Sequence, residues 1–600
     1  MSTVCKERVV AIRTVCAVCR SLDSLLAKTL GPNGKSTLLN TPTGQVLITN
    51  VGCTILRCMN VGHPLGTMII KSISDHHSYA GDGSKMFILY LASIFRSIAN
   101  SAEERLSIHQ LEQRNSLLNA VHYIRSHLFN NVLLPVVRRN CHVTDVCENK
   151  SATMTIMCNL VMTHLCGKYT EAIRSHLSHL LVNFLCSGLA SCESLSSEIV
   201  SCIDNFNLLC IDVDCMLPQS SYIFEGIVIQ RDFQNLHHST AECCQTRFVL
   251  LHSSFDKGDC EVTSTFEAND MSSLHKAFSW KSRCSTVLVD WLHKNSVNLI
   301  LSTGCIDGIL QTLCLKAGIS TVQFVDKEDF ERLRVLFHVT AIEFMSDLFE
   351  LKPDDFIGCS EICEANVFGQ KQFVCLRFPD PDHTCRKQSD QSTPHNRVEN
   401  LHSARKFSAH PECLKRQLVI CGMSAGACQQ IRLDLLHALK TLKLWFDNQW
   451  MNAEVSCCSA VHIAGGGSFE LICYDALQDF MKQNILELGV YETVCCKAVS
   501  AALLAVPLRL LQNSFQPKLA TVLYIKESIK ASRASGAYIC GFSGCNGRQL
   551  QADTTTIEPV MSKIILLDHV LELTEQLLRI DSLLYVKKLM QKSLSEEESV

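Results

Sequence analysis

The sequence lacks an excess of positive charge, and this sets the first limit on its function. Lysine and arginine total 55 against 59 aspartate and glutamate residues, which gives a formal net charge of −4. Proteins that hold a nucleic-acid backbone do so largely with clustered basic side chains, which displace the counterions of the phosphates. The charge balance therefore predicts that nucleic acid is not among the partners.

Long apolar runs are also missing. The longest stretches, such as residues 86–95 (MFILYLASIF), lie between charges and are much shorter than the ~20 residues that cross a bilayer. The first thirty residues contain scattered basic side chains and no apolar core followed by a cleavage site, so no secretory signal is visible. We expect no membrane insertion and a cytoplasmic location, where most of the 34 cysteines stay reduced and pack as small apolar side chains.

Apolar residues are abundant and reveal several units. A hydrophobic content of 47% over 600 residues excludes wholesale disorder and suggests about four domains. Helical spacing runs from Ile12 to Leu26 and stops before Gly31 and Pro32, and residues 45–49 predict a strand of a hairpin. The turn at residues 81–84 leads into a helix at 85–98 that is apolar nearly all round and should lie in a core.

The middle of the chain reads as a separate α/β unit. Short β-rich runs follow residue 224, namely GIVIQ, RFVLLH, STVLVDWL, VNLILS and STVQFV. A polar, proline-punctuated segment at 379–411 predicts an exposed loop or a disordered insertion. Helical periodicity returns at 431–446 and 564–578, and no repeat period is visible.

Three local motifs allow other functions. GPNGKST resembles a P-loop, but Thr29 stands where a glycine is required and a helix, not a strand, precedes it. Cys16 and Cys19 lie in the first helix without a second pair at zinc spacing, which favours buried packing. His76 and His77 could bind a metal, although adjacent histidines on a loop are usually solvated.

Taken in order along the chain, a further set of motifs resembles the group II chaperonins, the archaeal thermosome and the eukaryotic cytosolic chaperonin. The family's LGPKG, ITNDGATIL, GDGTT, GGGxxE and EPxxVK…LRIDD patterns appear as LGPNG (30–34), ITNVGCTIL (48–56), GDGSK (81–85), Gly465–Gly467 with Glu470, and Glu558, Pro559 and Lys563 followed by LRIDS (578–582). Within the family, PTGQVLITN, HPLGTMI and the CGK turn near Cys166 are most similar to the divergent chaperonin-like proteins associated with Bardet–Biedl syndrome.

This resemblance implies an α-rich, multidomain α+β fold. It comprises a helical equatorial domain, a small intermediate domain and an α/β apical domain. The implied boundaries are 1–150 and 465–600 (equatorial), 151–216 and 413–464 (intermediate), 217–378 (apical) and 379–412 (polar insertion). We expect the apical unit to fold on its own when it is cut near Leu217 and Pro379, because both cuts lie at breaks in composition.

The same motifs predict a site for ATP and Mg²⁺. Glycines let the backbone approach phosphate, the helix that starts after residue 83 attracts anions, and Asp82 is placed to hold the metal. Lys85 replaces a hydroxyl residue of the family and could either pair with a phosphate or block one. The resemblance assigns nucleotide binding to Leu30, Gly31, Pro32, Gly34, Gly81, Asp82, Gly83, Ser84, Lys85 and Gly466.

Hydrolysis needs a carboxylate that orients the attacking water. The two aspartate positions that the family uses are occupied here by Val51 and His437. Asp434 lies one turn earlier on the same helix as His437 and is a candidate substitute, although a solvated surface position is the simpler interpretation.

The resemblance therefore implies a chaperonin-like assembly factor that binds ATP and hydrolyses it poorly. It further implies partners among other chaperonin-like subunits, the cytosolic chaperonin and subunits of the ciliary BBSome complex, and a location at the centrosome, basal body or cilium. The alternative is an active ATP-dependent group II folding chaperonin. Because the first helical pattern starts by Val9 or Ile12, little chain remains for a ring-closing N-terminal strand, so we expect a monomer or hetero-complex rather than a homomeric double ring.

Overall fold

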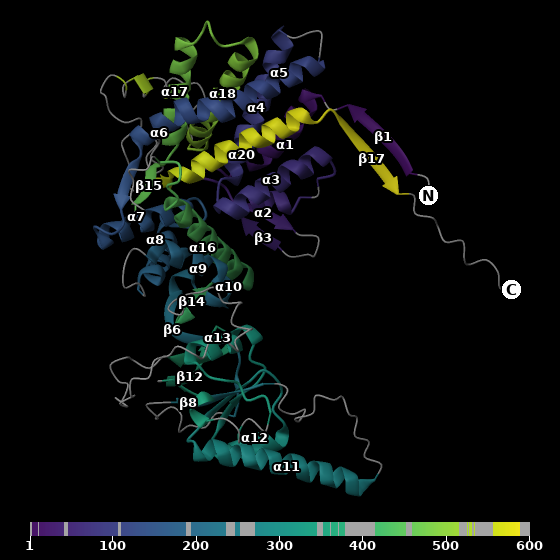
Figure 1. Cartoon of the computed structure of the whole chain (residues 1–600), viewed down its shortest axis with the longest axis vertical. Helices are drawn as coiled ribbons and strands as arrows, with labels where there is room; N and C mark the ends of the chain where they lie inside the picture. Colours follow the sequence, from purple (N-terminus) through teal and green to yellow (C-terminus); the bar gives the residue numbers. More distant parts are fainter. Residues whose placement is uncertain are drawn as a thin grey trace, which may run out of the picture. The chain divides into compact units, whose positions relative to one another are not determined.

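The computed structural model divides the chain into two compact units (Figure 1). The first unit combines Met1–Ser178 with His437–Val600, and the second is His179–Leu436. The structure describes residues 3–9, 11–40, 46–59, 61–105, 110–187, 194–235, 246–252, 270–344, 348, 352–360, 362–369, 371–377, 414–451, 459–514, 525, 527, 529, 530, 533 and 556–588. The expected polar insertion at 379–412 lies outside the described residues.

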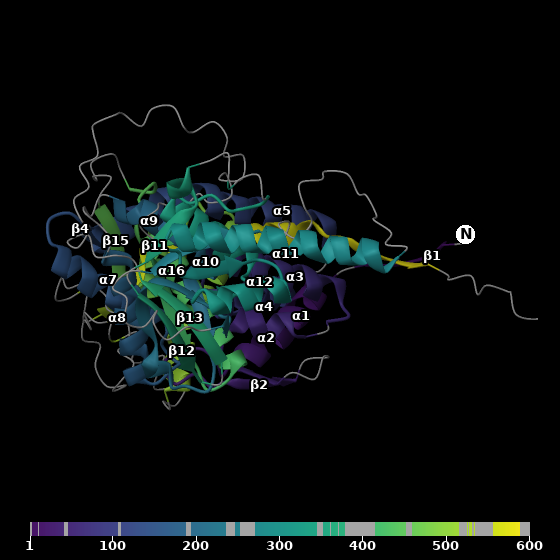
Figure 2. The same ribbon diagram turned by 90° about the horizontal axis from the view of Figure 1, so that it is seen from below.

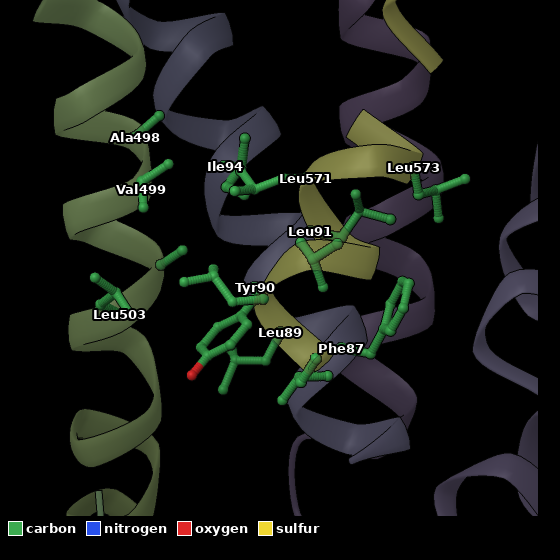
Figure 3. Close-up of a cluster of buried hydrophobic side chains, with 14 of the residues drawn as sticks. Phe87, Leu89, Tyr90, Leu91, Ile94, Ala498, Val499, Leu503, Leu571 and Leu573 are labelled. Carbon is green, nitrogen blue, oxygen red and sulfur yellow. The ribbon is translucent and has the colours of Figure 1, made fainter. Parts of the chain in front are cut away.

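The first unit has a helical core built from both ends of the sequence. Its helices are α1 (Ile12–Leu26), α2 (Gly52–Arg57), α3 (Pro64–Ala80), α4 (Ser84–Arg105), α5 (Gln110–Tyr123), α6 (Leu134–Asn140), α7 (Lys150–His164), α17 (Ser468–Gln483), α18 (Val490–Asn513) and α20 (Val560–Arg579), with a π-helix η1 (Ile124–Leu133) between α5 and α6. Helix α4 is buried as the sequence predicts, and Figure 3 shows Leu91 and Ile94 of α4 beside Leu571 of α20.

Helix α18 is long and apolar enough to cross a membrane when length and composition alone are considered. Its side chains nevertheless belong to the protein core: Ala498, Val499 and Leu503 are at most 2% exposed and join the cluster that contains α4 (Figure 3). An apolar helix enclosed by other helices is a core element. The helix therefore gives no support to membrane insertion.

Three small sheets complete the first unit. The hairpin that the sequence predicts is confirmed as β2 (Thr37–Asn40) and β3 (Val46–Thr49), and β15 (Ser459–Ala464) pairs with β16 (Ile557–Pro559) and β4 (His142–Asp145). The third sheet is an antiparallel ribbon of β1 (Thr3–Val9) and β17 (Ser582–Lys588), which extends from the helical core in Figures 1 and 2.

Strand β1 corrects one expectation. A seven-residue strand does precede the first helix, and it pairs along its whole length with β17 of the same chain. Its residues, TVCKERV, show no clear alternation of polar and apolar side chains, so long-range pairing rather than a local pattern defines it. The argument against a homomeric ring therefore loses its premise.

The second unit contains two mixed sheets. One has the order β11-β8-β9-β10-β7 and the other β12-β13-β6-β14-β5. The strands are β5 (Cys210–Val213), β6 (Tyr222–Ile229), β7 (Phe233–Asn235), β8 (Thr246–Leu251), β9 (Leu299–Ser302), β10 (Ser320–Val322), β11 (Ile357–Ser360), β12 (Ile362–Phe368), β13 (Lys371–Arg377) and β14 (Arg416–Cys421).

Helices and short 3₁₀ turns accompany these sheets. They are α9 (Leu195–Asp204), α10 (Phe206–Leu209), α11 (Met271–Lys294), α12 (Gly308–Lys316), α13 (Lys327–Phe337), η3 (Pro218–Ser220) and η6 (Pro353–Asp355), and the boundaries between the units fall within α8 (Glu171–Cys186) and α16 (Ala425–Trp445). Figure 2 shows α11 as one long helix.

One of the expected β-rich runs is helical. STVLVDWL lies inside α11, where the buried residues Ser285, Leu288, Val289 and Leu292 follow a spacing of three and four. A run of β-branched residues therefore took the helical state because only a helix places these four side chains on one face. The other four runs form β6, β8, β9 and β10, so the α/β character of the middle of the chain is confirmed.

Candidate functional site

A cavity in the first unit gathers segments from six parts of the chain. Most of its walls come from the loop after α1, the start of α4, the end of α7 with the turn that follows it, the N-terminus of α17, the C-terminal half of α18, and β16 with α20. The lining residues are Leu30, Gly31, Pro32, Asp82, Gly83, Lys85, Met86, Thr163, His164, Cys166, Lys168, Gly466, Gly467, Val506, Leu510, Leu511, Ser514, Thr556, Glu558 and Lys563.

The first wall is the loop of residues 28–35, here called the glycine loop. The Gly34 N–H donates to the Gly31 carbonyl at 3.0 Å, and the Lys35 N–H donates to the Lys28 carbonyl at 2.9 Å. Gly31 has φ = 92°, a left-handed conformation that favours glycine. A Cβ on Gly34 would lie 2.2 Å from the Thr29 carbonyl oxygen, so the turn is too tight for any side chain there.

The second wall is the turn between α3 and α4. Gly81 ends α3 with φ = 77°, and Gly83 has φ = 91° and would place a Cβ 2.7 Å from His76 Nε2. Helix α4 begins immediately afterwards at Ser84, so its N-terminal dipole faces the region of Asp82. Backbone N–H groups and a positive dipole end are suited to an anionic ligand.

Asp82 is the carboxylate that this turn presents to the cavity. Its side chain is accessible to solvent through the cavity although protein surrounds it. Enclosure by itself would raise the pKa of Asp82, but His164, Lys168 and a hydrogen bond from the Gly83 N–H hold that pKa well below its usual range. Asp82 is therefore ionised at neutral pH.

The third wall is the turn at residues 166–168, which the prediction of site residues did not include. A Cβ on Gly167 would lie 2.6 Å from the Gly31 carbonyl oxygen, so this turn and the glycine loop are in close contact. Lys168 Nζ lies 3.1 Å from His164 Nε2, and His164 Nδ1 lies 3.1 Å from the Thr441 hydroxyl. The turn thus places Lys168 in the cavity, beside Asp82, in addition to Lys85 and Lys563.

The fourth wall is apolar and comes from α17 and α18. Gly466 and Gly467 have φ values of 68° and 91° at the start of α17. Val506, Leu510 and Leu511 of α18 line the same side. This apolar wall adjoins the glycine loop, because a Cβ on Gly31 would lie 3.0 Å from Leu510 Cδ2. Apolar side chains beside an anion-binding loop suit a ligand with a flat apolar part and a charged part.

The floor is a buried ionic cluster. Lys563 Nζ lies 3.0 Å from Glu470 Oε1 and 2.9 Å from Glu558 Oε2, and the Tyr90 hydroxyl donates to Glu470 Oε1 at 2.9 Å. Burial raises the pKa of Glu558, Lys563 opposes that shift and Glu470 adds to it. The cluster holds two carboxylates around one ammonium group directly below the cavity.

The structure places most of the sequence-predicted binding residues on the cavity. Leu30, Gly31, Pro32, Asp82, Gly83, Lys85 and Gly466 line it. Gly34, Gly81 and Ser84 lie behind the lining: the glycines shape their turns, and the Ser84 hydroxyl accepts a hydrogen bond from the Cys53 N–H at 3.2 Å. Sequence reasoning missed the residues from α7, α18 and the 166–168 turn, although the CGK segment was a signal for the last.

The two family positions for the catalytic acid do not line the cavity. Val51 is 5% exposed and caps the N-terminus of α2, and its N–H donates to the Thr49 hydroxyl at 3.1 Å. His437 stacks edge-on against His77, with ring centroids 4.4 Å apart. Neither a buried valine nor a histidine in this position supplies a carboxylate to a water molecule.

Asp434, His76 and His77 are buried, although the sequence predicts solvated positions for them. Asp434 is 1% exposed and accepts a hydrogen bond from Gln430 at 3.1 Å in the second unit, so the interpretation as a solvated residue is wrong. His76 and His77 lie inside α3 and are 2% and 5% exposed rather than solvated. Among the described residues no group of three or more His, Cys, Asp or Glu side chains could hold a metal ion.

The cavity fits Mg²⁺ in one specific way. Mg²⁺ is commonly held by one or two carboxylates together with substrate phosphates and water, rather than by a cage of protein ligands. Asp82, ionised and reachable from the cavity, could supply that single carboxylate, and the glycine turns leave room for phosphate oxygens. The donor set therefore fits Mg²⁺ that arrives with a nucleotide.

The chain has a helical unit built from both ends of the sequence, a cavity within that unit, and an α/β unit inserted in the sequence between its two segments. This arrangement defines a chaperonin-type subunit. The chain matches the model of the TCP-1/cpn60 chaperonin family over residues 22–588 and belongs to that family. The α-rich, multidomain α+β fold that the sequence predicts is thereby confirmed.

Individual relatives are similar at low identity. The chain is 20% identical over 464 residues to the BBSome complex assembly protein BBS10 of Homo sapiens, which covers 74% of this chain and 58% of that protein. It is 22% identical over 585 residues to the thermosome subunit alpha of Archaeoglobus fulgidus, with 97% and 93% covered. The similarity to the Bardet–Biedl group that three short segments indicated is therefore confirmed, although the aligned region spans less than two thirds of the human relative.

Proposed function

We propose that this chaperonin-like protein is an assembly factor that binds Mg-ATP as a structural ligand and hydrolyses it slowly or not at all. The observation that carries the proposal is that the cavity keeps the residues suited to bind nucleotide but lacks the acids suited to hydrolyse it. Asp82 and the glycine turns remain on its surface, whereas the positions of both water-orienting acids hold Val51 and His437 and lie outside the lining.

In this site the residues of the chain would divide the work of binding. The glycine loop and the N-terminus of α4 would receive the phosphates, Asp82 would hold the magnesium ion, and the apolar side chains of α18 would contact the base. Lys168 would add positive charge beside the phosphates. Two carboxylates line the cavity among the described residues: Asp82, which this proposal assigns to the metal, and Glu558, which is paired with Lys563 at 2.9 Å, so neither is left to orient water.

The similarity to BBS10 supports assembly of the BBSome as the process served. That role would place the protein at the centrosome, basal body or cilium within the cytoplasm, with BBSome subunits, chaperonin-like subunits and the cytosolic chaperonin as partners. Identification of the proteins that co-purify with the full-length chain at native expression level tests this part. Absence of all three classes would contradict it.

Isothermal titration and a phosphate-release assay on one preparation test the nucleotide part. We expect Mg-ATP to bind, turnover to be negligible, and Asp82→Asn to weaken binding mainly in the presence of Mg²⁺. Fast turnover that Asp82→Asn abolishes would instead establish the active folding chaperonin, the alternative function. A protein that binds no nucleotide would show that only the fold is retained.

A further inference from the structure

Lys85 stands in the cavity where the family has a hydroxyl residue, and its ammonium group contacts protein oxygens. Lys85 Nζ donates to the main-chain carbonyl of Thr29 at 2.7 Å and also contacts the side-chain oxygen of Asn50. Thr29 belongs to the glycine loop and is itself 2% exposed. The lysine therefore reaches from the first turn of α4 to the base of that loop.

Asn50 extends this connection to the turn at residues 166–168. Its Nδ2 donates to the Gly34 carbonyl at 3.1 Å and to the Gly167 carbonyl at 3.0 Å. One ammonium group and one amide thus join the glycine loop, the 166–168 turn and the start of α4. Asn50 is 4% exposed, so these hydrogen bonds are made away from bulk solvent, where they are strongest.

The stem of Lys85 is also fitted closely to its surroundings. A Cβ on Gly52 would lie 2.9 Å from Lys85 Cγ, so the absence of a side chain at residue 52 leaves the path for the lysine. The two oxygens that hold the ammonium group are neutral. They direct two of its three N–H donors into the protein rather than toward a ligand.

We propose that Lys85 is a positioning residue that orders the glycine loop before any ligand arrives, and that it acts on nucleotide through this loop instead of pairing with a phosphate. The inference rests on the proposed function of the cavity. A loop that is already ordered loses less conformational entropy on binding, so affinity rises without a direct contact. It also decides between the two roles that the sequence left open, pairing with a phosphate or blocking one.

The first experiment needs no ligand. Hydrogen exchange of the glycine loop is compared between the wild-type protein and Lys85→Met, which keeps the stem and removes the donors. We expect the Gly34 and Lys35 amides to exchange about tenfold faster in the variant, as the loss of hydrogen bonds to a charged group implies. Lys28→Met is the matched control, because Lys28 is exposed in the same loop and loses the same charge. Equal exchange in Lys85→Met and wild type would overturn the proposal.

The second experiment separates positioning from phosphate pairing. Dissociation constants of AMP, ADP and ATP with Mg²⁺ are measured for wild type, Lys85→Met and Lys85→Gln. Positioning predicts one common loss for all three nucleotides, about tenfold in Lys85→Met, and a smaller loss in Lys85→Gln, whose amide can still donate. A loss that grows with the number of phosphates would mean direct pairing and would refute the proposal.

The two experiments distinguish a failure of the proposed nucleotide binding from a failure of the proposed role of Lys85. If wild type binds none of the nucleotides, the proposed function fails, and hydrogen exchange alone decides whether Lys85 orders the loop. If Lys85→Met does not fold, Lys85→Gln provides both measurements, because its amide preserves part of the contact with Thr29 and Asn50. Faster exchange in Lys85→Gln than in wild type then supports the proposal, and unchanged exchange contradicts it.

Discussion

The buried cluster below the cavity offers the sharpest test of the energetics. Lys563 is 4% exposed and lies within 3.0 Å of carboxylate oxygens of both Glu470 and Glu558, while Glu470 itself is fully buried. At an effective dielectric constant of about 20, each contact of this length is worth about 5 kcal/mol of Coulomb energy. Burial of the charges costs several kcal/mol for each ion, so much of that attraction is offset.

Replacing Lys563 by Met removes the attraction but leaves the desolvated carboxylates behind. Breaking a buried pair in this way costs about 3–5 kcal/mol, which should lower the melting temperature of the first unit by about 5–10 °C. The side chain of Met has nearly the length of the lysine stem, so the packing changes little. Scanning calorimetry of the full chain measures the effect as the shift of the transition that belongs to this unit.

Two further variants make the measurement interpretable. Lys482→Met removes an exposed lysine, 69% accessible and 3.5 Å from Asp479, and should cost about 0–1 kcal/mol. The double variant Lys563→Met with Glu470→Gln removes the fully buried charge as well and should recover part of the lost stability. If Lys563→Met is no more harmful than Lys482→Met, the reasoning about the cluster is refuted.

Three shorter predictions concern pH, boundaries and the loop motif. Burial, with the charge of His142, lowers the pKa of His462 to about 4, so its stabilisation is present above pH 6.5 and is lost as the pH falls toward 4; pH-dependent melting should show a flatter acid limb in His462→Gln and a smaller flattening in His142→Gln, because burial is the larger cause. A fragment of residues 179–436 should melt at a higher temperature in circular dichroism than 217–378, which lacks β14, the partner of β6; equal melting would contradict this. Lys35→Ala should leave nucleotide affinity unchanged in titration calorimetry, because its side chain is exposed outside the cavity lining, and a loss would revive the P-loop interpretation.

The sequence predicts those parts of the site that are encoded in short motifs. The glycine loop and the turn at residues 81–84 carry their geometry locally, since positive φ angles and close backbone approach require glycine at Gly31 and Gly83. The apolar wall of α18 has no such signal, because Leu510 reads as one more core leucine of an apolar helix. Its place at the cavity follows from packing between segments that lie hundreds of residues apart.

The errors have the same origin. The segment STVLVDWL has the composition of a strand, yet the burial of Leu288 and Leu292 on one helical face outweighs that weak preference. The sequence predicts solvated His76 and His77 because adjacent histidines on a loop usually are, but both lie in α3 and are buried. In each case tertiary packing overrides the tendency of the single residue.

The origin of the cavity walls explains how nucleotide that is bound but not hydrolysed would still serve the protein. The lining residues range from Leu30 to Lys563 in the sequence and come from both segments of the first unit. The second unit is inserted between these two segments in the sequence. The cavity therefore exists only when these distant segments are assembled, so a ligand that binds there binds the folded state and not the unfolded one. Such a ligand stabilises the first unit by RT ln(1 + [L]/Kd), about 2.7 kcal/mol at a hundredfold excess over Kd. Valine at residue 51 and histidine at residue 437 leave this contribution intact, because it depends on binding alone. If turnover is slow, as we propose, the stabilised state lasts longer.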